Sequence, residues 1–135
     1  MSTLSPASIA DALSRLQADP ARFDAALSAH GDASTLRPVL LRALETRHAH
    51  DAAGAEVTQV ADILRRDQKF APPGRPSVHL VKLRNQQAST RQAALVARQA
   101  HAQAAQAFAR ALSLPISEKR TPTESFSRWL ARHLD

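Results

Sequence analysis

The chain has 135 residues, the common size of one domain, and no cysteine, which excludes disulfides, thiolate metal sites and cysteine nucleophiles. Hydrophobic residues make up 44% of it, but 28 of them are alanine, so large apolar side chains for a core are few. The net charge of +6 is uneven, because residues 1–67 carry 7 basic and 9 acidic side chains whereas residues 68–135 carry 11 and 3.

The same composition indicates the fold class. Three glycines, no tyrosine and few β-branched residues leave little material for strands, whereas Ala, Leu, Arg and Gln all favour helix. We therefore expect an all-α protein, an irregular helical bundle with a long basic helix rich in Ala, Arg and Gln and a short amphipathic C-terminal helix.

Two helices are predicted at the start of the chain. Ser5–Pro6 is typical of an N-cap followed by proline at the first helical position, and the apolar spacing predicts a helix to about Ala18. Asp19–Pro20 repeats this start, so we expect a second, short helix that ends at Gly31.

The next stretch contains two amphipathic segments with a predicted break between them. Leucines at helical spacing predict a third helix over residues 34–48. After a loop around residues 50–54, apolar residues at i, i+3, i+4 and i+7 predict a fourth helix over residues 57–67.

A helix-turn-helix motif can be placed on residues 49–64 with Gly54 at its turn. Its second helix would present four groove-facing side chains, namely Thr58, Gln59, Arg65 and Arg66. His50 departs from the motif where a small residue is usual, and Glu56 and Asp62 would face phosphates. We favour the alternative of two consecutive core helices joined by a loop.

Prolines interrupt the chain at residues 71–77, which predicts a hinge. It separates a mildly acidic N-terminal unit, residues 1–70, from a basic part, residues 78–135, and we expect both to form one structural domain. Gly74-Arg75-Pro76 matches the core of the AT-hook, a minor-groove binder, but lacks the flanking basic clusters.

No proline or glycine occurs over residues 77–113, which predicts one continuous helix. A seven-residue repeat inside it places Arg84, Arg91 and Arg98 on one stripe. The same register predicts a seam of small residues that permits close helix approach and a homo-oligomer contact: Ala93, Ala97, Ala100, Ala104, Ala107 and Ala111, with Phe108.

This arginine stripe (Arg84, Arg91 and Arg98) is the leading candidate for a nucleic-acid contact, together with Arg75 and Lys82. No acidic residue occurs between Asp67 and Glu118, and unneutralised cations on one face are what phosphate binding needs. The alternative is an ordinary exposed helix whose arginine stems cover alanine. No aromatic residue lies between the arginines, which disfavours single-strand recognition by stacking.

The C-terminal helix has the clearest local pattern. Residues 121–124 form a capping box in which Glu124 is expected to reach back to the cap. Phe126, Trp129 and Leu130 share one face, which we expect to be buried, in this chain or against a docked partner. Arg128 and Arg132 share the opposite face.

Catalytic chemistry has no candidate in this sequence. The six histidines lack metal-ligand spacing, and neither a nucleophile elbow nor a phosphate-binding glycine loop occurs. We predict no enzyme activity, catalytic residue, metal or cofactor. No apolar stretch is long enough to span a bilayer and no secretory signal is evident, so a cytoplasmic location is the expectation.

Two functions remain open from the sequence. The first is a small non-enzymatic nucleic-acid-binding protein that contacts phosphates through the basic helix. The second is a helical adaptor or secretion-associated protein that docks on protein partners through the alanine seam and the face formed by Phe126, Trp129 and Leu130.

Overall fold

The computed structural model describes residues 4–70, 74 and 77–134. These residues form five α-helices: α1 (Pro6–Ala18), α2 (Asp24–Ser28), α3 (Ala33–Lys69), α4 (Val78–Ala111) and α5 (Pro122–His133). An isolated bridge between Ser117 and Arg120 is the extent of β-structure in these ranges. The predicted all-α fold, with a long basic helix and a short C-terminal helix, is confirmed.

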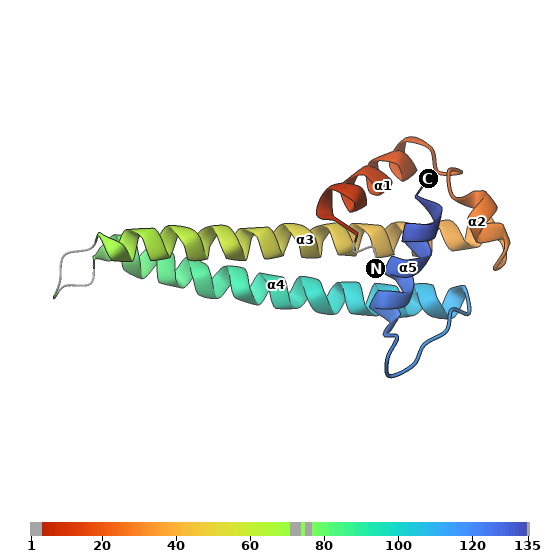
Figure 1. Cartoon of the computed structure of the whole chain (residues 1–135). Helices are drawn as coiled ribbons and strands as arrows, with labels where there is room; N and C mark the ends of the chain where they lie inside the picture. The colour runs from red at the N-terminus through yellow and green to blue at the C-terminus, as the bar shows by residue number, and fades with distance from the viewer. Residues whose placement is uncertain (1–3, 71–73, 75–76, 135) are drawn as a thin grey trace.

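The two long helices, α3 and α4, lie side by side as an antiparallel hairpin (Figure 1). Helices α1, α2 and α5 gather around one end of it, where α3 begins and α4 ends (Figure 1). We call this end the head. The rest of the hairpin, residues 53–69 and 78–97, projects away from the head, and we call it the arm.

The contact between α3 and α4 has the spacing of a coiled coil. Residues buried or half-buried along each helix recur in alternating steps of three and four, the heptad pattern that keeps one face toward a partner helix. On α3 this seam comprises Leu36, Val39, Ala43, Thr46, His50, Ala53, Val57, Val60, Leu64 and Asp67. On α4 it comprises Leu80, Leu83, Gln87, Thr90, Ala94, Ala97, His101, Ala104 and Phe108.

This register corrects the predicted alanine seam. Ala97, Ala104 and Phe108 lie in the observed seam as predicted, whereas Ala93, Ala107 and Ala111 are exposed and Ala100 is half-buried beside it. The small residues alone favour one register for this helix, but the buried Leu80 and Leu83 fix a seam that differs from it by one residue in every second position. The partner of the seam is α3 of the same chain, so this face of α4 is already occupied.

The continuity of α3 corrects two further predictions. Residues 33–69 form one helix, so the predicted loop at residues 50–54 is absent and the helix-turn-helix placement is wrong. Gly54 lies within the helix on an exposed face, and a Cβ atom there would contact nothing within 4 Å. A glycine inside a helix is only about 1 kcal/mol less favourable than alanine. The packing of α3 on α4 before and after Gly54 outweighs this cost.

The start signals at the helix ends are mostly confirmed. Ser5, Ser77 and Thr121 each accept a hydrogen bond from a backbone amide three residues on, as N-caps do. The second half of the predicted capping box is wrong, because the Glu124 carboxylate pairs with Arg128 at 2.8 Å. Likewise Asp19 caps only a turn, and α2 begins later, at Asp24.

The main core lies in the head. The rings of Phe108 and Phe126 meet edge to face at 5.1 Å between centroids, and those of Phe108 and Trp129 at 5.0 Å. Leucines and isoleucine from α1, α2 and α3 surround these rings: Ile9, Leu13, Leu27, Leu40 and Leu44. A second, smaller cluster joins the two helices at the far end of the arm: Leu64, Leu80 and Leu83, with Ile63.

Candidate nucleic-acid interface

The arginine stripe occupies one edge of the hairpin. Arg84, Arg91 and Arg98 each directly follow a seam residue of α4, and all three are exposed. Residues that flank a coiled-coil seam lie at the boundary between the two helices. At about 1.5 Å per residue, successive arginines are about 10 Å apart along the helix. The three arginines therefore lie on one face of α4, as the heptad spacing predicts.

No carboxylate neutralises the stripe within the described ranges. Helix α4 contains no acidic residue, and the ion pairs found there involve none of the three arginines. On α3 the residues that follow the matching seam positions along the arm are Gly54, Ala61 and Gln68. The edge therefore carries positive charge from one helix and small or neutral side chains from the other.

The other sequence candidates do not join this edge. Lys82 is exposed but lies two residues before Arg84, which places it about 200° around the helix, on the outer face of α4. Arg75, with most of the predicted hinge and the AT-hook match, falls outside the described residues. The stripe is thus a set of three.

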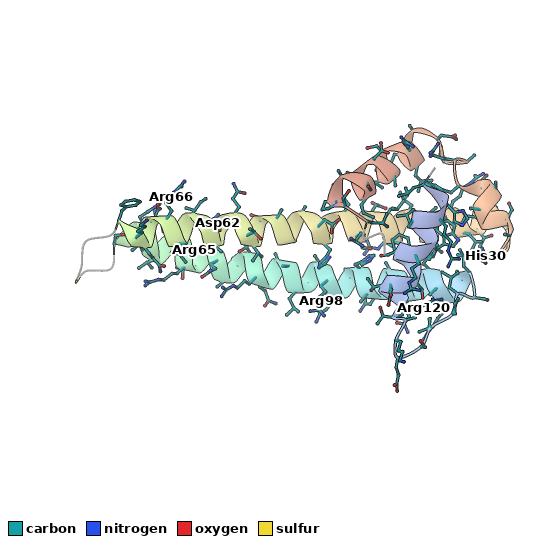
Figure 2. The ribbon with its side chains drawn as sticks, in the orientation of Figure 1. His30, Asp62, Arg65, Arg66, Arg98 and Arg120 are labelled. Atoms are coloured by element: carbon teal, nitrogen blue, oxygen red, sulfur yellow. The ribbon has the colours of Figure 1, made fainter. Side chains whose placement is uncertain are left out.

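The arm's far end carries additional cations that are partly paired. Figure 2 shows Asp62, Arg65 and Arg66 on α3 near that end and Arg98 on α4 closer to the head. Arg65 lies 3.4 Å from Asp62, and Arg66 lies 3.9 Å from the carboxylate of Asp67. These pairs are exposed and weak, so the guanidinium groups remain available to solvent.

The inner end of the stripe borders a hollow where α5 crosses the hairpin. Its volume is about 610 Å³, and Arg98, His50 and His101 line it together with residues 121–123 at the start of α5. On the same edge of α3, the Arg47 guanidinium donates to the Ser127 hydroxyl of α5 at 3.2 Å. Helix α5 and the arginine stripe therefore share one side of the hairpin.

A buried histidine lies beneath this hollow, and sequence reasoning missed it. His101 is 3% exposed, and its Nδ1 is 3.1 Å from the Thr46 hydroxyl. That hydroxyl donates to the Arg42 carbonyl at 2.8 Å, so it accepts from His101 Nδ1–H. Burial, reinforced by the charge of Arg47, lowers the pKa of His101 from 6.5 to about 4. The ring is neutral at pH 7, and its position in the heptad is the sequence pattern that would have placed it in the seam.

The face proposed for partner docking is buried in this chain. Phe126, Trp129 and Leu130 are 0%, 3% and 0% exposed and belong to the head core. The prediction of burial is confirmed. As they lie in the structure, these side chains offer no surface to a second protein.

The described part of the chain contains neither a metal-ligand cluster nor a candidate membrane-spanning helix. No group of three or more His, Asp or Glu side chains there could hold a metal ion. Among those residues, no helix combines the length and the apolar character needed to cross a bilayer. No protein-family model and no curated protein matches the chain. No solved structure matches it either.

Proposed function

We propose that the chain is a non-enzymatic protein that binds double-stranded nucleic acid along the edge of the α3–α4 hairpin. The observation that supports this is the arginine stripe, Arg84, Arg91 and Arg98, exposed and unneutralised on one edge. Duplexes carry dense negative charge, and guanidinium groups bind phosphate oxygens with two parallel hydrogen bonds.

The form of the edge favours a duplex over a single strand. The three arginines keep a fixed spacing on a rigid helix, whereas stacking of unpaired bases needs aromatic side chains, of which this edge has none. Contacts restricted to phosphates carry no base information. Binding is therefore expected to be independent of base sequence.

The alternative function, a helical adaptor, has weaker support. It requires Phe126, Trp129 and Leu130 to be accessible to a partner, and all three lie in the head core. It also uses the predicted alanine seam of α4, of which Ala97 and Ala104 are already packed on α3.

A pair of triple variants tests the proposal. In the first, Arg84, Arg91 and Arg98 are all replaced by Gln, which favours helix about as well as arginine does. We expect affinity for a mixed-sequence 20-base-pair duplex in about 50 mM salt to fall tenfold or more, because three phosphate contacts are lost. Fluorescence anisotropy with a labelled duplex measures this directly.

The control variant removes the same charge elsewhere. Arg22, Arg42 and Arg110 are exposed and lie in the head, away from the stripe. Their replacement by Gln lowers the net charge equally, and we expect a much smaller loss of affinity. Equal losses in the two variants would mean that only net charge matters, and the edge would then have no special role.

A further inference from the structure

A second group of cations lies in the head, apart from the arginine stripe. Arg128 and Arg132 are one turn apart on α5, and Arg120 precedes that helix in the connecting loop (Figure 2 labels Arg120). The three arginines line a small hollow of about 50 Å³. Its other lining residues are Leu114, Pro115, Ser125 and Trp129.

One residue that lines the hollow, Trp129, has an unused hydrogen-bond donor. Trp129 is 3% exposed, and its Nε1 is buried without a hydrogen-bond partner in the part of the chain that the structure describes. An indole N–H can only donate, so the missing partner must be an acceptor. Buried polar groups without partners are rare in native proteins, and one beside a hollow points to a ligand or an ordered water.

The charges around the hollow favour an anion as that acceptor. Arg128 donates to the Glu124 carboxylate at 2.8 Å, whereas neither Arg120 nor Arg132 forms an ion pair with a described residue. No acidic side chain lines the hollow. Of the three arginines that line the hollow, only Arg128 is paired with a carboxylate, and Arg120 and Arg132 remain free to bind oxygen.

The loop that carries Arg120 is held in place by hydrogen bonds. The backbones of Ser117 and Arg120 exchange two of them, at 3.0 and 3.1 Å, which closes a tight turn. The Ser125 hydroxyl donates to the Pro115 carbonyl at 2.8 Å and ties the loop to α5. The hollow is therefore largely formed before any ligand arrives, which reduces the entropy cost of binding.

We propose that this hollow is a binding site for a single phosphate group. Its oxygens would accept hydrogen bonds from Trp129 Nε1–H and from the guanidinium groups of Arg120 and Arg132. A volume of about 50 Å³ corresponds to only a few water molecules, which suits one tetrahedral oxyanion and not a sugar or a base. The phosphate can be free inorganic phosphate or the terminal phosphate of a nucleic-acid strand. The site is independent of the arginine stripe.

The chain's sole tryptophan is the natural probe of this site. Full-length protein is titrated with inorganic phosphate at constant pH and ionic strength while the fluorescence of Trp129 is recorded. We expect a saturable change with a dissociation constant of about 1 mM or lower, and no change with sodium chloride at matched ionic strength. No saturable change up to about 10 mM phosphate would overturn the proposal.

Matched variants separate the site from general charge effects. Arg120→Gln combined with Arg132→Gln should weaken phosphate binding about tenfold or more, since charge-assisted hydrogen bonds are lost. Arg22→Gln combined with Arg110→Gln removes the same charge and should leave it unchanged. Equal weakening in both double variants would contradict a specific site.

Two further arms test the indole and the source of the phosphate. Trp129→Phe keeps an aromatic ring in the core but lacks the N–H, so the rise in melting temperature that phosphate gives the native protein should shrink. An undiminished rise would contradict the indole contact. Stronger binding of 5′-phosphorylated than 5′-hydroxyl duplexes would identify a strand end as the source, and equal binding would identify free phosphate.

Discussion

The buried His101 of the seam should make the stability of the protein depend on pH. The pKa of His101 is lowered to about 4, mainly by burial, whereas in the unfolded chain it takes its ordinary value of 6.5. Between these values the unfolded chain binds more protons, so the free energy of unfolding falls as pH falls through this window. The full stability is present above pH 6.5. His133, whose pKa burial also lowers, acts in the same direction.

We therefore predict a loss of up to about 3 kcal/mol of stability from His101 between pH 6.5 and pH 4. Urea unfolding at a series of pH values measures it. In His101→Leu most of this pH dependence should disappear, whatever the variant's overall stability. His48→Gln, which changes an exposed histidine of α3, should keep it. An unchanged profile in His101→Leu would show that the ring is not held neutral in the seam.

At the scale of the elements, the sequence predicted most helix ends, but it did not predict that α3 runs without a break through residues 50–54. Helix starts are local events, because a serine or threonine side chain satisfies an amide only three residues away. The course of α3 through Gly54 is decided by α4, which packs on both sides of that position and is distant in sequence. Gly54 alone predicts the end of a helix, but with α4 packed beside it the helix continues through this residue.

Gly54 offers a direct test of the single α3 helix. In a helix interior, Gly54→Ala should stabilise the protein by about 1 kcal/mol, because alanine is the better helix former and nothing obstructs its Cβ atom. Gly31→Ala is the matched contrast. Gly31 has φ +155°, which L side chains rarely adopt, so alanine should destabilise there. Thermal unfolding measures both, and a destabilised Gly54→Ala would argue for a break in α3.

The candidate site could also be predicted only in part from the sequence. The stripe of Arg84, Arg91 and Arg98 follows from heptad spacing alone, because residues seven apart share a face of any helix. Its placement on the hairpin edge required knowing that α3 covers the neighbouring seam. The phosphate hollow could not be predicted, since Arg120 and Trp129 meet there only through the turn and loop before α5.

At the scale of the whole molecule, the head and the arm differ in how much apolar surface they bury. The head holds the aromatic core, whereas between that core and the cluster at its far end the arm is joined only by a thin seam of Ala, Val, Thr and Gln side chains. A two-helix arm exposes much surface for its number of residues. The arginine stripe thus lies on an elongated hairpin edge that projects from the head, and the proposed duplex binding depends on that edge.

The salt dependence of duplex binding tests this account most directly. Each phosphate neutralised on a duplex releases a counterion and contributes about −0.9 to the slope of log K against log salt concentration. We predict a slope of about −3 to −4 for the native protein and a slope about 3 units flatter when Arg84, Arg91 and Arg98 are replaced by Gln. The same slope in both proteins, or no salt-sensitive binding below about 100 µM, would contradict nucleic-acid binding through the hairpin edge.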